Sequence, residues 1–150
     1  MWLGRANTGG DAEVWVPDVK VLATGDTVVS PIPFAFGSYM SEWPDVLQKM
    51  MDLHPTVIVP GHGPVMHDDS YMRTLQAICR EIVAEVRASD ANHATVEELR
   101  KKLKLDEYMT QLYGDNKRKK SEFLGTFVEP GLDRALQEAK GQLKPEGMDE

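Results

Sequence analysis

Two polar side chains in the first half of the chain come directly after short apolar runs, at points where each run ends beside glycine. Asp26 follows the run Val19–Ala23, and His62 lies between two glycines after the run Thr56–Val59. Groups just past the carboxyl ends of parallel strands line the crevice where α/β proteins bind ligands. If the two runs are neighbouring parallel strands, Asp26 and His62 meet at one edge of the sheet.

A carboxylate beside an imidazole is a ligand pair suited to zinc, and also to iron or manganese. The glycines on both sides of His62 would let the backbone turn sharply and approach a bound ion closely. We predict that Asp26 and His62 bind a metal ion. The same residues also allow a simpler interpretation, in which Asp26 caps the next turn and His62 is an ordinary loop residue.

Strands must position these two groups, and the sequence predicts three of them with one intervening helix. Glu13–Val16 and Val19–Ala23 flank a Pro-Asp turn and predict a hairpin, and Thr56–Val59 predicts a buried strand. Between the second and third strands, Ser41–Leu53 has helical periodicity, with Ser41 as a candidate N-cap and a proline in the first turn. Strand, helix and strand in this order predict a right-handed parallel crossover and therefore an α/β fold.

The rest of the chain has the pattern of helices. Tyr71–Ala88 repeats apolar residues with helical period, Thr95–Glu98 forms a capping box, and Pro130 opens a last amphipathic helix. We therefore predict one domain over residues 1–144, with an α/β region over 1–66 and a helical region over 67–144. Residues 145–150 are expected to form a flexible tail.

The motifs around the two candidate ligands resemble the C-terminal half of a metallo-β-lactamase-fold domain. The resemblance runs from Gly4 to about Val65 and rests on order and spacing. It comprises the element Gly-x-x-Asn-Thr-Gly-Gly-Asp at residues 4–11, Val-Leu-Ala-Thr-Gly-Asp at 21–26, a helix with Trp43, and Val-Pro-Gly-His-Gly at 59–63. The implied fold is half of an αββα sandwich, with a small mixed sheet and helices, followed by a helical C-terminal part.

The resemblance also implies roles for particular residues. Asp26 would be the bridging ligand of two metal ions, with zinc as the metal, and His62 the late histidine ligand of the second metal. Such a site hydrolyses a carbonyl, ester, thioester or phosphoryl centre of a small molecule. Asn7 stands where the family usually places its middle histidine, and Asp11 ends the same element. His67 is a candidate extra ligand, or else a surface residue at the start of a helix.

The His-x-His-x-Asp-His signature of the family does not occur in this chain. Because a catalytic zinc site normally uses three protein ligands and this chain offers two, we expect it to be inactive as a monomer. Two functions stay open. The chain is either part of a metal-dependent hydrolase that a second copy could complete, or a non-catalytic remnant that binds itself or a partner.

Half a sandwich would leave one face of its sheet uncovered. We expect that face to carry residues such as Val14 or Trp15, Val21 and Ile58, and to form an interface in a homodimer. The helices after residue 67 offer the alternative, since they could cover the sheet within one chain.

Composition narrows the function classes further. The 150 residues include 24 acidic and 17 basic ones, for a formal net charge of −7, which argues against nucleic acid and anionic membranes as partners. The single cysteine, Cys79, excludes an internal disulfide framework and is expected in a helix core. No secretory leader or long apolar segment is recognisable, so we expect a cytoplasmic protein.

Overall fold

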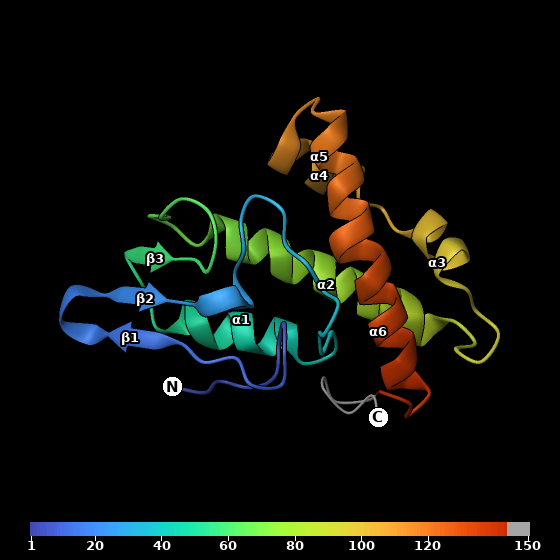
Figure 1. Ribbon diagram of the computed structural model, residues 1–150, viewed down its shortest axis with the longest axis horizontal. Coiled ribbons are helices and arrows are strands. Elements are labelled where there is room, and N and C mark those ends of the chain that lie inside the picture. Colours follow the sequence, from blue (N-terminus) through green and yellow to red (C-terminus); the bar gives the residue numbers. More distant parts are fainter. Residues whose placement is uncertain (144–150) are drawn as a thin grey trace.

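The computed structural model describes residues 1–143, and the predicted tail at 145–150 lies outside the described residues. Within the described range, a small sheet is followed by a helical region that extends away from it (Figure 1). The α/β fold class is therefore confirmed.

The sheet has three strands in the order β1, β2, β3, namely Val14–Val16, Val21–Ala23 and Val57–Val59. β1 and β2 are antiparallel, whereas β2 and β3 are parallel and are connected through the helix α1 (Trp43–Asp52). The predicted hairpin and the predicted crossover are both confirmed. The first two strands are shorter than predicted, because Pro17 starts a 3₁₀ turn over Pro17–Val19 and this turn takes Val19 out of the second strand.

The predicted N-cap of α1 is wrong. The helix begins at Trp43, with Pro44 in its first turn as expected and Glu42 in the N-cap position. Ser41 lies one residue earlier and bonds to the last helix instead. Its backbone N and its Oγ donate to the two carboxylate oxygens of Glu138, over 3.0 and 3.1 Å.

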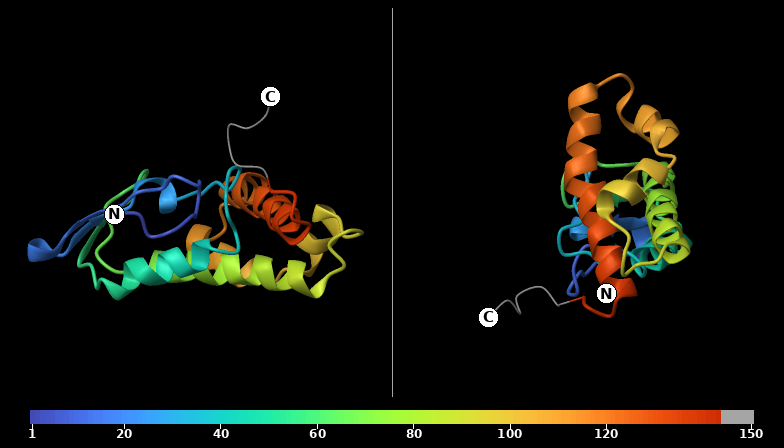
Figure 2. Two further views of the ribbon diagram at one scale, coloured as in Figure 1. Left: turned by 90° about the horizontal axis from the view of Figure 1, so that it is seen from below. Right: turned by 90° about the vertical axis from the view of Figure 1, so that its right-hand side faces the viewer.

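The strand register divides the sheet into two faces. Trp15, Leu22 and Ile58 are in register across the three strands and therefore share one face, on which α1 and α2 (Ser70–Ala88) lie (Figure 2). Leu22 and Ile58 are completely buried there. We call the opposite face the valine face; its residues are Val14, Val16, Val21, Ala23, Val57 and Val59.

The predicted exposed patch was therefore partly wrong, because it combined residues from both faces. Ile58 and Trp15 belong to the helix-covered face, and only Val14 and Val21 belong to the valine face. Side chains alternate between the two faces along each strand, so that neighbouring residues of one strand cannot share a face.

The helical region continues from α2 through α3 (Val96–Lys102), α4 (Asp106–Tyr113) and α5 (Lys117–Phe123). A π-helical segment, Leu124–Val128, then leads into α6 (Glu129–Ala139). The capping box of α3 is confirmed: Thr95 Oγ1 accepts from the Glu98 N–H while the Glu98 carboxylate accepts from the Thr95 N–H. None of the helices in residues 1–143 is both long and apolar enough to cross a membrane.

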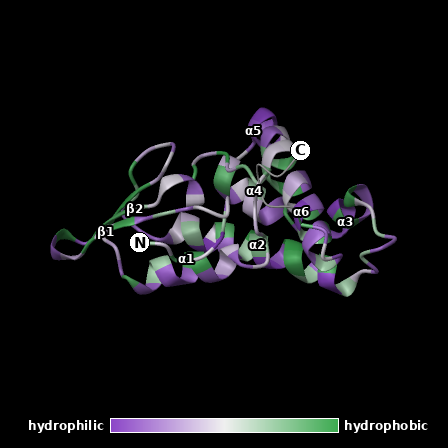
Figure 3. Cartoon of the chain, turned by 60° about the horizontal axis from the view of Figure 1, so that its bottom comes forward, coloured by the Kyte–Doolittle hydropathy of each residue, from purple (hydrophilic) through white to green (hydrophobic). Residues whose placement is uncertain are grey.

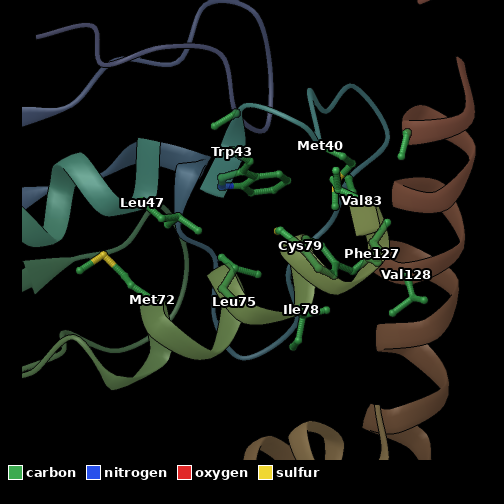
Figure 4. Packing of buried hydrophobic residues seen from close by; sticks show 14 of the residues in the cluster. Met40, Trp43, Leu47, Met72, Leu75, Ile78, Cys79, Val83, Phe127 and Val128 are labelled. Carbon is green, nitrogen blue, oxygen red and sulfur yellow. The ribbon is translucent and has the colours of Figure 1, made fainter. Parts of the chain in front are cut away.

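One buried apolar cluster includes side chains from both regions (Figure 4). Trp43 of α1 packs edge-on against Phe127, with ring centroids 5.6 Å apart, and Phe127 stacks on Phe123 at 5.5 Å. Cys79 is fully buried, as expected for a core residue, and burial raises the pKa of its thiol. The helical region is thus packed against the element that connects β2 and β3.

Candidate metal site

Asp26 and His62 lie side by side at the carboxyl ends of β2 and β3. Asp26 is in the 3₁₀ turn Gly25–Thr27 that follows β2, and His62 comes three residues after β3. The distance from His62 Nε2 to Asp26 Oδ1 is 3.5 Å, and the side chains are 66% and 41% exposed. The expected juxtaposition is confirmed, and both groups are open to solvent and to a ligand.

Backbone hydrogen bonds fasten the two loops to each other beyond the strands. The Gly61 N–H donates to the carbonyl oxygens of Gly25 and Val28, over 2.9 and 3.0 Å. The Ser30 N–H donates to the His62 carbonyl over 3.0 Å, within an isolated parallel bridge between Val29 and His62. Backbone hydrogen bonds between the two loops, on either side of Asp26 and His62, therefore hold these two residues close together.

The glycines beside His62 are required by close approach and by backbone conformation. A Cβ built on Gly61 would lie 2.1 Å from Asp26 Oδ1, closer than real Cβ contacts allow. Gly63 has a φ of +97°, and a Cβ there would lie 2.3 Å from the Ser30 carbonyl oxygen. Only residues without a side chain let the two loops come this close.

The donor set has the right chemistry for zinc but is too small for a catalytic site within one chain. A carboxylate oxygen and an imidazole nitrogen suit two positions of a tetrahedral zinc site. Among residues 1–143, no group of three or more His, Cys, Asp or Glu side chains could hold a metal ion. The chain by itself therefore does not fit a catalytic zinc centre, and the role of Asp26 and His62 as metal ligands stays a prediction.

Within residues 1–143, neither Asp11 nor His67 adds a ligand to this group, and Asn7 is a buried amide. Asp11 accepts hydrogen bonds from the backbone N and the Oγ1 of Thr8, over 2.9 and 2.6 Å, and so stabilises its own turn. His67 is exposed and belongs to no such metal-binding group. Asn7 is 3% exposed, and its Oδ1 has no hydrogen-bond partner in the described part of the chain.

Sequence reasoning missed Glu13, a buried carboxylic acid connected to the turn that carries Asp26. Glu13 is 1% exposed and accepts a hydrogen bond from Thr27 Oγ1 over 3.2 Å, while its other oxygen has no partner among the described residues. Burial raises the pKa of Glu13. Alternation along the strand could have revealed it, because Glu13 is two residues before Trp15 and therefore shares the helix-covered side.

No family model matches the sequence, and no curated protein matches it either. Among solved structures, the crystal structure of VMB-1 at pH 5.5 is similar over 53% of this chain and 39% of its own, with 30% sequence identity and a TM-score of 0.48. The crystal structure of the DIM-1 metallo-β-lactamase exposed to ceftazidime is similar over the same shares, with 20% identity and a TM-score of 0.48.

The chain thus spans about two fifths of the length of each of these structures.

Proposed function

We propose that this chain carries half of a metallohydrolase site, in which Asp26 and His62 bind one metal ion together with ligands from another polypeptide. The observation that supports this is the convergence of the two side chains, 3.5 Å apart, from strands that are far apart in sequence. Gly61 leaves room for that approach, because a Cβ added at this position would overlap Asp26 Oδ1. Zinc suits this donor pair best, and iron and manganese are the alternatives.

The chemistry proposed for the completed site is hydrolysis of a small molecule at a carbonyl, ester, thioester or phosphoryl centre. A bound metal ion would supply Lewis acidity and lower the pKa of a bound water. The chain's own contribution is positioning. Two loops paired through backbone hydrogen bonds hold a carboxylate oxygen and an imidazole nitrogen at one solvent-exposed edge.

Zinc binding by the purified chain tests this proposal. The absorption spectrum of cobalt bound in place of zinc reports independently on the type of ligand. Asp26→Ala and His62→Ala should each weaken zinc binding at least about tenfold, because each removes one of two protein ligands. The pair Asp90 and His93 provides a matched control. These two side chains are also exposed and lie 2.7 Å apart, but they come from one turn.

Asp90→Ala and His93→Ala should leave zinc affinity unchanged. The proposal fails if zinc binds equally well to the Asp26 and His62 variants, or if the variants at 90 and 93 are the ones that lose it.

A second function is supported by a different observation, the uncovered valine face of the sheet. In that alternative the chain is a non-catalytic module that associates through its sheet, and Asp26 and His62 form only a surface pair. Association that persists in metal-free protein, combined with no zinc binding above that of the Asp26→Ala variant, would favour this alternative.

A further inference from the structure

The valine face is apolar throughout and substantially exposed. Val14, Val16 and Val59 are 62%, 42% and 37% exposed, and Val21, Ala23 and Val57 are partly buried. Val65 extends this surface at 48% exposure, because Met66 pairs with Ile58 and alternation then turns Val65 to the valine face. No charged residue belongs to the face.

In residues 1–143, α1 and α2 lie on the opposite side of the sheet. Figure 2 (left) shows α1 and α2 in one layer beneath the strands, with α3 to α6 away from them. In Figure 3 the ribbon along β1 and β2 is mostly in the hydrophobic colour, with hydrophilic residues at the hairpin turn. A contiguous apolar surface of this kind is typical of an interface.

We propose that the valine face binds the valine face of a second copy of this chain, with a two-fold axis parallel to β2 and β3. The part of this proposal that concerns metal rests on the half-site proposed above. Each copy has a formal charge of −7, so two copies repel each other over most of their surfaces. An uncharged face avoids that repulsion, and an apolar surface is complementary to itself, as a two-fold interface requires.

The direction of the axis follows from the incomplete site. A two-fold axis parallel to the strands preserves strand direction, so that the carboxyl ends of β2 and β3 lie at the same edge in both copies. An axis perpendicular to the strands would place the two edges at opposite ends of the dimer. Only the first arrangement brings a second Asp26 and a second His62 to the side of the first pair.

The spacing of stacked sheets suits such a shared site. Sheets packed face to face are about 10 Å apart, a gap that two ligand side chains and a metal ion between them can span. The row of the valine face nearest the ligands is Val14, Ala23 and Val59, with its smallest residue in the centre. The second copy would raise the number of candidate ligands from two to four.

Sedimentation velocity of the metal-free protein over a wide concentration range tests the interface. We expect a dimer. Val59→Asp should weaken it at least about hundredfold, because each dimer would then bury two carboxylates in an apolar interface without partners. Phe36→Asp is the matched control, since Phe36 is 61% exposed but lies outside the face, and it should not change the dimer.

Val14→Asp, in the other outer strand of the same face, is the second variant in case Val59→Asp disturbs folding, and far-ultraviolet circular dichroism checks both. A monomer at all concentrations overturns the proposal. A dimer that survives both aspartates overturns it too, as does a complex that forms only with a different protein.

The axis is tested with single surface cysteines. Cys79 is buried and its thiol has a raised pKa, so an added cysteine can be labelled selectively. Asp18→Cys marks the hairpin turn and Pro64→Cys marks the ligand edge; both positions are exposed. With the axis parallel to the strands, spin labels at 64 should lie close to each other across the dimer, and so should labels at 18.

Close approach between position 18 of one copy and position 64 of the other, in mixed dimers, overturns the proposed axis.

The metal and dimer experiments separate the two proposals. A dimer that binds no zinc contradicts the half-site and leaves the interface in place, whereas a monomer whose zinc binding depends on Asp26 contradicts only the interface.

Discussion

Ile58 and Val59 are neighbours in β3, yet their environments are opposite. Ile58 is completely buried on the face that α1 and α2 cover, while Val59 on the valine face is 37% exposed. Both are β-branched and apolar, so residue type does not separate them. The difference is that, within residues 1–143, α1 and α2 cover one face and no helix covers the other, so the proposed interface lies on the face that folding leaves exposed.

The largest expected difference between the faces is in folding stability. Ile58→Ala should lower the free energy of unfolding by about 2–5 kcal/mol, since it leaves a cavity in a buried cluster. Leu22→Ala should act similarly. Chemical denaturation measures the free energy of unfolding, and its slope against denaturant concentration should be the same for variant and wild type. A loss well under about 1 kcal/mol would mean that the helix-covered face is not the core.

Gly61→Ala probes the edge that both faces share. The added Cβ would meet Asp26 Oδ1 at 2.1 Å and the Gly25 backbone at 2.7 Å, so the two loops must separate. We expect a loss of roughly 2 kcal/mol in the free energy of unfolding, together with weaker zinc binding. Gly10→Ala is the control, because nothing lies within 4 Å of a Cβ there, and its effect should stay within about 0.5 kcal/mol.

Glu13→Gln tests whether the helix-covered side tolerates charge. Burial raises the pKa of Glu13 above its usual 4.5, so ionisation of this group disfavours the folded state. Protonated Glu13 therefore contributes to the free energy of unfolding. This contribution is fully present below pH 4.5 and is lost as the pH rises through the raised pKa. Glu13→Gln should therefore stabilise the protein at pH 7, by roughly 1 kcal/mol, and have little effect at pH 4.

Unfolding measured at both pH values checks this expectation. An equal effect at pH 4 and pH 7 would show that the substitution acts through packing or the Thr27 hydrogen bond rather than through the charge.

Val59→Thr should have the smallest effect on the isolated chain. The substitution keeps the shape and the β-branching and places a hydroxyl on an exposed side chain, so the free energy of unfolding should change by less than about 0.5 kcal/mol. Thermal unfolding at high dilution measures it. A loss as large as that of Ile58→Ala would mean that something in the same chain covers the valine face.

Much of the site could be predicted from sequence because its determinants are local. The glycines, the β-branched runs and the periodic helix between them predict β2, α1 and β3, and a parallel crossover then brings residues after β2 and β3 to one edge. Asp26 and His62 accordingly lie 3.5 Å apart.

Other features depended on partners that are distant in sequence. Ser41 has the residue type of an N-cap, but it bonds to Glu138, 97 residues later, and the helix starts two residues beyond it. Glu13 has the residue type of an exposed strand position, but its carboxyl is buried and bonds to Thr27. Local patterns do not show these contacts, because they arise only when separate elements pack.

The order of the elements and the pairing of a carboxylate with an imidazole can be read from short segments of the chain, because both follow from turn chemistry and hydrophobic period. Which face of the sheet is buried becomes clear only when the elements are packed together. That choice depends on where α1 and α2 pack, and strands with apolar residues on both faces do not specify it in advance.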